Sequence, residues 1–309
     1  GLLLPTNKSA ENFCNFFDHY QLDYFLVSAS DLLQHDIIQD WFSIIRAHKG
    51  SANRIDWYKL TYRIAQSSNK SKNITRENTI RFVDELYENG ISVSDVISDQ
   101  PCPKKIFNYR LKSLVNAWDN DAVVIFDTET TGLNFNKAKI VQLAAIKVQA
   151  GKIIDVFDRY INIGLTDNFS ELDIDFDNSS QVHKITREQI AAGDTELDVL
   201  SSFFDFVGKH PLIAHNMNFD NTMLRMAVTN LDSFELETRF NDITFHSQFD
   251  SLLLAKSLLP NEESYKLENL LKSQKLEGTN SHNALDDVKA TASLVNLLIG
   301  KAKEKLASI

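Results

Sequence analysis

Only two cysteines, Cys14 and Cys102, occur among the 309 residues. Two thiols so far apart provide neither a disulfide framework nor the closely spaced ligands of a zinc site, and they favour a reducing compartment. No apolar run approaches the roughly 18 residues that a membrane span requires. The chain starts without Met and without the basic segment of a signal peptide, so we expect a processed chain or a piece of a longer one. Together these absences predict a cytoplasmic protein with no membrane association.

The net charge of −10 is confined to one part of the chain. Residues 1–120 carry 14 basic and 14 acidic side chains, whereas residues 121–309 carry 18 basic and 28 acidic ones. An acidic domain is a poor general binder of polyanions. If this part of the chain acts on nucleic acid, metal ions and a few local cations must attract the substrate.

The spacing of apolar residues changes near residues 118–121 and divides the chain in two. Residues 1–119 repeat apolar side chains at helical spacing, which predicts a separate all-helical accessory domain. This domain contains no glycine-rich phosphate loop and no metal-ligand spacing. In residues 120–309 strands come first and helices later, which predicts an α/β domain with a mixed sheet.

The secondary structure of the α/β domain follows from its pattern of apolar runs and breaks. Ala150 and Gly151 are expected to join two strands as a hairpin. The stretch NFSELDIDFDNSS, residues 168–180, indicates an acidic loop. We expect strands at 122–127, 140–148, 152–162 and 211–215, and helices at 196–209, 217–230, 247–259, 265–273 and 283–305.

The stretch VVIFDTETTGL, residues 123–133, places two carboxylates after an apolar run that is typical of a strand buried on both faces. On a strand, residues two positions apart point to the same side. Asp127 and Glu129 should therefore project together. Two adjacent carboxylates are costly unless a cation lies between them, so this pair predicts a metal site.

Further acidic residues occur where a helix is expected to begin. Asp220 follows a strand within IAHNMNFD, and His282 precedes the last helix within SHNALDD. In that last helix Asp287 lies beside the apolar stripe, while Asp286 is rotated about 100° away. We therefore expect Asp287 to be functional and Asp286 to be solvated. The apolar stripe consists of Leu285, Val288, Ala292 and Val295.

Three segments, FDTETTGL, HNMNFD and HNALDD, resemble in order the three motifs of the DEDDh family of DnaQ-like 3′–5′ exonucleases. The third motif has the pattern H-x-A-x-x-D, which His282, Ala284 and Asp287 satisfy. The likeness covers residues 121 to about 300. A single D-x-E is a weak signal, whereas three motifs in order, each at an expected corner of the fold, are specific.

The resemblance implies a ribonuclease-H-like sheet and hydrolysis that depends on two Mg²⁺ or Mn²⁺ ions. Asp127, Glu129 and Asp287 would ligate one ion, and Asp127 would bridge to the second. Asp220 would complete the acidic cluster, directly or through water, and His282 would take a proton from the attacking water. Oxygen ligands suit these hard cations, and histidine can accept a proton near neutral pH.

The resemblance also implies contacts with the terminal nucleotide. Leu133 would pack on the terminal base, and the backbone around Thr130 and Gly132 would approach the nucleotide because glycine lets chains come close. Phe135 or Phe219 would stack on a base, or both would belong to the core. The residues expected to bind substrate are Thr130, Gly132, Leu133, Asn216 and Phe219.

Several basic residues and histidines remain open to two interpretations. VHKIT, beginning at Val182, resembles the family's His-Gly-Ile-Thr segment, but Lys184 stands where Gly is usual, which puts the approach of this loop to the substrate in question. His183 and His215 are consistent with structural hydrogen bonding as well as with substrate contact. The candidates for phosphate contacts, for which solvated surface side chains are an equal alternative, are Lys137, Lys139, Lys184 and Arg187.

DTETTGL resembles the proofreading subunits of bacterial replicative polymerases more than the oligoribonuclease or ribonuclease T branches. We therefore expect the substrate to be the 3′ end of single-stranded DNA, with RNA as the alternative. A different class of function is a nuclease fold that serves as a docking module for a helicase or polymerase, but the intact acidic set argues against it. LLLPTNKSAENF, residues 2–13, faintly resembles helical segments of UvrD-like helicases, which implies a helicase partner or fusion.

Overall fold

The computed structural model describes residues 7–22, 36–48, 52–67, 76–88, 91, 103–166, 170–245, 248–278 and 281–308. The chain forms two compact units, Gly1–Ile106 and Phe107–Ile309. No helix in the described ranges is both long enough and apolar enough to cross a bilayer. Residues 2–6, where the helicase-like likeness begins, lie outside the described residues.

The N-terminal unit is helical, as the spacing of its apolar residues predicted. Helices α3 and α4 are linked by Asp56, which is buried and accepts hydrogen bonds from Ser43 Oγ at 2.9 Å and Arg46 Nε at 2.9 Å. The Arg46 guanidinium lowers the pKa of Asp56 to about 2. The described helices of this unit are α1 (Asn7–His19), α3 (Asp36–His48), α4 (Arg54–Ser67) and α5 (Arg76–Glu88).

Helix α7 (Pro103–Asn120) crosses the division between the units. From Phe107 onward its residues belong to the C-terminal unit, and Leu111, Leu114 and Trp118 are buried in that unit's core. Because the apolar side chains of α7 complete this core, the compact units divide within the helix. The division thus comes earlier in the chain than the 119/120 boundary expected from the sequence.

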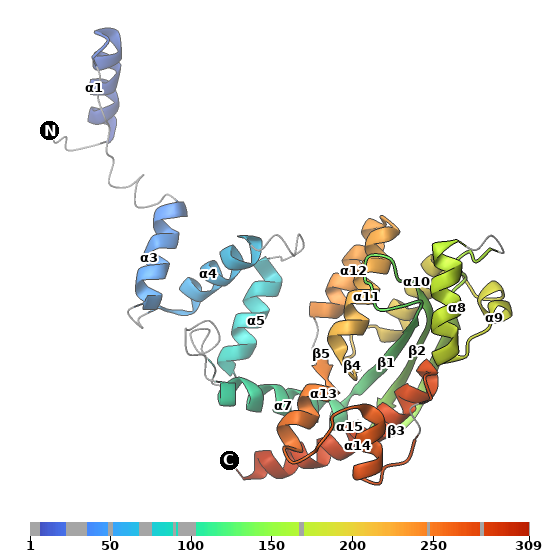
Figure 1. Ribbon diagram of the computed structural model, residues 1–309. Helices are drawn as coiled ribbons and strands as arrows, with labels where there is room; N and C mark the ends of the chain where they lie inside the picture. The colour runs from blue at the N-terminus through green and yellow to red at the C-terminus, as the bar shows by residue number, and fades with distance from the viewer. Residues whose placement is uncertain are drawn as a thin grey trace. The chain divides into compact units, whose positions relative to one another are not determined.

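The C-terminal unit contains a five-stranded sheet in the order β3-β2-β1-β4-β5, with helices on both faces (Figure 1). The first three strands are antiparallel, whereas β4 pairs with β1, and β5 with β4, in parallel. Ala150 and Gly151 connect β2 to β3 with φ of 47° and 76°, the positive values that a tight hairpin needs. The mixed sheet expected from the sequence is confirmed. Its strands are β1 (Ala122–Thr130), β2 (Ile140–Gln149), β3 (Lys152–Tyr160), β4 (Leu212–Ala214) and β5 (Gln248–Asp250).

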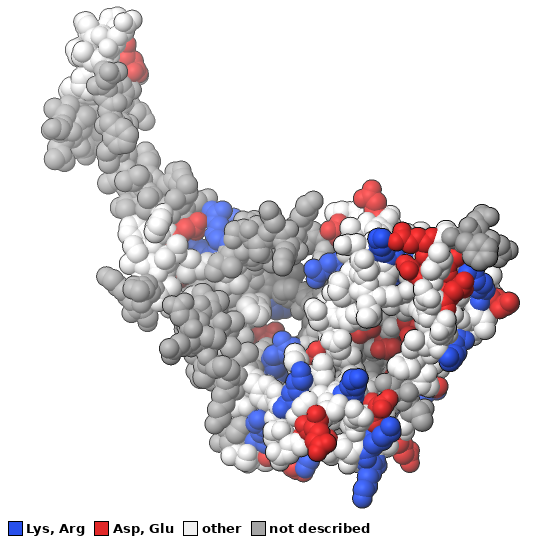
Figure 2. All heavy atoms as spheres, in the orientation of Figure 1, with Lys and Arg blue, Asp and Glu red and all other residues white. Residues whose placement is uncertain are grey.

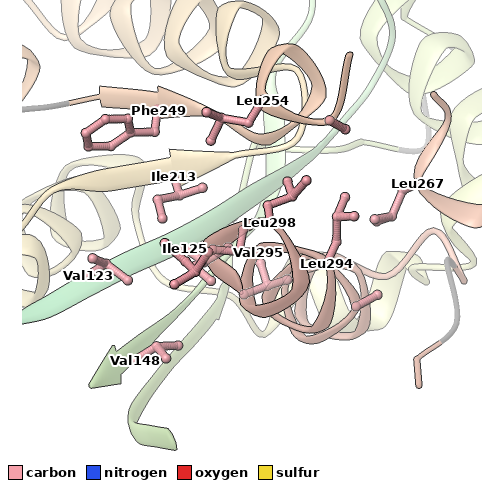
Figure 3. Close-up of a cluster of buried hydrophobic side chains, with 14 of the residues drawn as sticks. Val123, Ile125, Val148, Ile213, Phe249, Leu254, Leu267, Leu294, Val295 and Leu298 are labelled. Atoms are coloured by element: carbon pink, nitrogen blue, oxygen red, sulfur yellow. The ribbon is translucent and has the colours of Figure 1, made fainter. Parts of the chain in front are cut away.

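Side chains of β1 alternate between two apolar cores. Val123 and Ile125 face the core that includes the last helix (Figure 3), while Val124 and Phe126 face the core on the opposite side of the sheet. All four are at most 1% exposed, so β1 is buried on both faces as its apolar run predicted. The surrounding helices are α8 (Glu171–His183), α9 (Arg187–Ala191), α10 (Glu196–Val207), α11 (Met217–Asn230), α12 (Phe234–Phe245), α13 (Ser251–Leu258), α14 (Leu267–Ser273) and α15 (Ala284–Ala307).

The acidic loop expected at residues 168–180 is wrong, because α8 occupies most of this stretch. The helix begins with a capping box: Ser170 Oγ accepts from the Asp173 amide at 3.2 Å, and the Asp173 carboxylate accepts from the Ser170 amide at 3.0 Å. The buried Phe176 anchors the helix, and Arg187 pairs with Asp173 at 3.1 Å. Helix α8 contains few apolar residues, so the spacing of its apolar side chains did not predict a helix.

Further elements differ from the sequence prediction. The helix expected at 247–259 begins only at Ser251, because Gln248–Asp250 form β5 against β4. Asp250 then caps α13, with its Oδ1 accepting from the Leu252 amide at 2.9 Å. A strand of this length has too few residues for its periodicity to distinguish it from a helix. Helices α9 and α12 lie where no element was predicted.

Candidate active site

Asp127 and Glu129 lie inside β1 and point to the same face of the sheet as Val123 and Ile125. The strand continues to Thr130, with an irregularity in its pairing to β2 immediately after Glu129. Both carboxylates are partly exposed, while the strand residues before them are buried. The paired projection that the sequence predicted is confirmed.

Asp287 reaches these two carboxylates from the first turn of α15. Asn283 caps the helix by accepting from the Asp286 amide, and the Ser281 amide donates to Asp287 Oδ1 at 2.9 Å. Asp287 is 8% exposed, whereas the neighbouring Asp286 is more open to solvent, as expected. Asp127, Glu129 and Asp287 each offer a carboxylate oxygen within 4.8 Å of the others.

The pKa values of the three carboxylates are raised by burial and by one another. Burial is the largest cause for Asp127, followed by the charges of Asp220, Glu129 and Asp287, and its pKa is far above the usual range. Burial and then the charge of Asp287 raise the pKa of Glu129 to about 8. Burial raises the pKa of Asp287 to about 6, although the Ser281 amide opposes this shift. Three carboxylates that resist ionisation together indicate a site for a cation.

Asp220 is held on the other side of β1. Its Oδ1 accepts hydrogen bonds from the Thr128 amide at 3.1 Å and from Thr128 Oγ1 at 2.7 Å, and the side chain is 3% exposed. Burial raises the pKa of Asp220 to about 7, which the bonds from Thr128 partly oppose. The charge of Asp220 acts on Asp127 and Glu129, but Asp220 does not belong to the group of three converging oxygens among the described residues.

His282 lies directly ahead of the α15 cap and is exposed. Its backbone is left-handed, with φ of 56°, a conformation that most side chains avoid. The charge of His282 lowers the pKa of Asp287, so the two side chains lie close enough to interact. The third motif therefore places its histidine and its carboxylate at one corner of the site.

The segment that follows Glu129 presents an open surface. Thr130 is buried, and its Oγ1 donates to the Gly132 carbonyl at 2.8 Å. A Cβ at Gly132 would meet nothing within 4 Å, so the fold itself does not require glycine there. Leu133 is 81% exposed. An exposed apolar side chain and an unobstructed backbone therefore follow Glu129 within four residues.

The second motif supplies two more of the predicted contact residues. Asn216 has a φ of 77°, and its amide donates to Asp250 Oδ1 at 3.1 Å. Phe219 packs against Phe135 with ring centroids 5.6 Å apart, at the edge of the core that Val124 and Phe126 face. This contact favours the core interpretation for both rings, and it ties the segment after β1 to α11.

Most of the candidate phosphate-binding cations already have partners within the fold. Lys137 pairs with Glu171 at 2.5 Å, Arg187 pairs with Asp173 and Asp177, and the Lys184 ammonium donates to the Gln181 carbonyl. Figure 2 shows basic side chains interspersed with the acidic ones that gather around α8. Lys139 is near Glu196 and opposes the rise of that residue's pKa.

Both histidines of uncertain role make structural hydrogen bonds. His183 Nδ1 accepts from the Ile185 amide at 3.1 Å, and its Nε2 lies 3.1 Å from Ser179 Oγ. Burial lowers the pKa of His183 to about 4. His215 Nε2 donates to the Tyr265 carbonyl at 3.0 Å, and its Nδ1 lies 2.9 Å from Ser251 Oγ.

Lys184 ends α8 in the left-handed conformation, with φ of 62° and ψ of 12°, and its amide donates to the Ser180 carbonyl at 2.9 Å. Glycine is the usual residue at this position of a helix end because it has no Cβ. Lys184 therefore forms the same backbone turn that glycine forms in the family, but as a residue with a Cβ it is strained in this conformation.

Three residues that support the site were not identified from the sequence. Thr128 holds Asp220, Ser281 holds Asp287, and Gln142 on β2 bonds to the first residue of α15. The signals were local: Thr128 lies between the two carboxylates, Ser281 precedes the third motif, and Gln142 is an amide flanked by apolar residues within a strand.

The donor set fits a divalent cation. Asp127, Glu129 and Asp287 provide oxygen ligands alone, which suit Mg²⁺ and Mn²⁺ rather than soft metals. A bound cation would also compensate the mutual repulsion that raises their pKa values. The residues present therefore fit the divalent metals used by exonucleases with these motifs.

Sequence relatives match a little over half of the chain. The chain is 31% identical over 187 residues to the PolC-type DNA polymerase III of Bacillus subtilis and 32% identical over 185 residues to that of Oceanobacillus iheyensis. Each alignment covers 60% of this chain and 12% of the relative, so the chain spans only about an eighth of these proteins.

A solved structure of E. coli Exonuclease I in complex with a dT13 oligonucleotide aligns with 60% of this chain and 43% of that chain, at a TM-score of 0.49 and 21% identity. The family model for exonucleases of the RNase_T type matches residues 124–295, from β1 to the middle of α15. All three sequence motifs lie within or overlap this range. The chain therefore belongs to the RNase_T exonuclease family.

Proposed function

We propose that the C-terminal unit is a metal-dependent 3′–5′ exonuclease that removes nucleotides from single-stranded DNA. The observation that carries this proposal is the convergence of carboxylate oxygens from Asp127, Glu129 and Asp287 within 4.8 Å, at raised pKa. Membership in the exonuclease family supports hydrolysis of a phosphodiester bond. The exposed side chain of Leu133, four residues beyond Glu129, supports packing against a terminal base.

Asp127, Glu129 and Asp287 would hold the metal, with Mg²⁺ or Mn²⁺ as the ions and Asp220 as a further carboxylate acting directly or through water. Two such ions, when bound, supply activation of the attacking water and charge stabilisation at the departing 3′-oxygen. Thr128 keeps Asp220 oriented through two hydrogen bonds. Ser281 does the same for Asp287.

His282 would act as the general base. Its exposed side chain lies at the corner that also carries Asp287, where a ring nitrogen can take a proton from the attacking water at neutral pH. Leu133 would pack on the terminal base, and the backbone of Thr130 and Gly132 would border the terminal nucleotide.

DNA is the proposed polymer because the similar sequences belong to PolC-type DNA polymerases. The match covers only 12% of those polymerases. A role in proofreading beside a polymerase is therefore proposed together with the DNA substrate. RNA is the alternative substrate, and the 2′-hydroxyl is the local feature by which the two polymers differ.

The test measures mononucleotide release from a 3′-labelled single strand in the presence of Mn²⁺, with Asp287→Ala and Asp286→Ala as a matched pair on one helical turn. We expect Asp287→Ala to abolish release and Asp286→Ala to retain it, because only Asp287 faces the other carboxylates. Release that persists in Asp287→Ala or in EDTA would refute the metal mechanism. In a separate reaction, faster cleavage of an RNA strand than of the DNA strand would make RNA the proposed substrate.

A further inference from the structure

A buried amide lies on the strand next to the catalytic carboxylates. Gln142 is 0% exposed within β2 and is the register partner of Glu129 on β1. Its Nε2 donates to Asp158 Oδ1 at 2.8 Å, and its Oε1 accepts from the Ala284 amide at 3.3 Å. One partner is an acceptor and the other a donor, so together they fix the orientation of the amide. A buried amide left unpaired is unfavourable, because it loses its hydrogen bonds to water without replacing them.

A second contact joins the same strand pair to the same helix end. Tyr160 is the register partner of Gln142 on β3, and it lies on the same face of that strand as Asp158. Burial raises the pKa of Tyr160, and the side chain of Asn283, the cap of α15, lies close enough to lower it. The hairpin of β2 and β3 therefore bonds to Ala284 through Gln142 and places Tyr160 close to Asn283.

These contacts bear on Asp287 because it lies less than one helical turn beyond Ala284. Apolar packing of α15 against the sheet is strong but has no preferred direction, so it permits small slides and rotations of the helix. Hydrogen bonds fix position more narrowly. The carboxylates of Asp127 and Glu129 repel that of Asp287, and a helix end that is not anchored would relieve this repulsion by moving away.

We propose that Gln142, held by Asp158, is a positioning residue that sets where α15 begins relative to β1 and thereby brings Asp287 to Asp127 and Glu129. The inference rests on the proposed function, since its purpose is to keep the three carboxylates at metal-binding distance. It assigns a role in the site to a residue that touches neither metal nor substrate.

The donor role of Gln142 and the acceptor role of Asp158 can be exchanged by mutation. Gln142→Glu keeps an oxygen for the Ala284 amide but sets a carboxylate against Asp158, which disrupts the clamp. Asp158→Asn alone keeps an acceptor for Gln142 Nε2 and should behave as wild type. In the double variant Gln142→Glu/Asp158→Asn, the introduced asparagine amide would donate to the introduced carboxylate. The network is then restored with its polarity reversed and with unchanged net charge.

The first readout is amide hydrogen exchange of residues 281–290 in the full-length, metal-free protein. We expect Gln142→Glu to accelerate exchange in this segment and the double variant to restore it. Val295→Ala serves as the control, because it removes buried volume from the same helix further along without touching its start. Unchanged exchange in Gln142→Glu would overturn the inference whether or not the protein is a nuclease.

The second readout is Mn²⁺ affinity measured by calorimetry. We expect Gln142→Glu to weaken binding about tenfold, the order seen when residues that orient metal ligands are changed. The double variant should regain most of the wild-type affinity, and Val295→Ala should keep its affinity while lowering the melting temperature. Faster exchange with unchanged affinity would overturn the positioning role. A wild-type protein that binds no Mn²⁺ would instead reject the proposed function, and this inference with it.

Discussion

Removing one charge from the carboxylate cluster is expected to stabilise the metal-free protein at alkaline pH. The folded state raises the pKa of Glu129 from 4.5 to about 8, chiefly by burial and by the charge of Asp287. A carboxylate whose pKa is raised on folding favours the folded state fully at pH values below its unfolded pKa. That contribution is lost as the pH rises through the folded pKa. The Glu129→Gln variant lacks this titration.

Each pKa unit corresponds to about 1.4 kcal/mol, so the full change at Glu129 represents on the order of 5 kcal/mol above pH 8. Because Glu129 is partly exposed, water screens part of this cost. We therefore expect Glu129→Gln to raise the free energy of unfolding by about 2–4 kcal/mol at pH 8.5. At pH 4.5 the two proteins should be about equally stable.

The assay is urea unfolding in EDTA at several pH values, followed by tryptophan fluorescence. Trp118, which is buried in the C-terminal unit, reports on the unfolding of that unit. The wild-type free energy of unfolding should fall from pH 5 to pH 8.5, and Glu129→Gln should flatten the curve. Asp286→Asn, at a solvated acid next to the cluster, serves as the control and should follow wild type. Parallel curves for wild type and Glu129→Gln, or a less stable variant at pH 8.5, would refute the reasoning.

Adding Mn²⁺ should reverse the order, since ligand binding to the folded state stabilises it and the variant has lost a ligand; the same urea series with metal checks this. Lys184→Gly should raise stability by about 1 kcal/mol by relieving the left-handed strain, and an unchanged melting temperature would count against it. Gly132→Ala should leave the melting temperature unchanged, because a Cβ there meets open space, but should raise KM for the strand; a lowered melting temperature would contradict this. Thr128→Val removes a hydroxyl that lowers the pKa of Asp220, so the acid limb of the cleavage pH profile should move to higher pH, and a superimposable profile would argue against ionised Asp220 as the active form.

The core strand, its paired carboxylates and the last helix could be predicted because local pattern and tertiary environment agree there. The apolar run before Asp127 fits a strand buried on both faces. In α15 the rotation of about 100° per residue places Asp287 beside the apolar stripe and Asp286 away from it. Both signals are contained within a few residues of the site.

The parts that could not be predicted depend on distant partners. Helix α8 is poor in apolar residues, and its Asp173 is compensated by Arg187, which follows only after the helix has ended. Strand β5 exists because β4 lies beside it. The role of Gln142 depends on Asp158 and Ala284, one on another strand and the other 142 positions away. In each case the deciding contact is absent from any local window of sequence.

The origin of Asp287 in α15 has a consequence for biosynthesis. Asp127 and Glu129 belong to a strand that pairs with its sequence neighbour, whereas their third companion leaves the ribosome only after every strand of the sheet has been made. A nascent chain that has just completed its sheet holds only two of the three carboxylates whose oxygens converge within 4.8 Å, so the proposed metal site is still incomplete. The proposed nuclease activity would therefore begin only after α15 has been synthesised and has packed against the sheet.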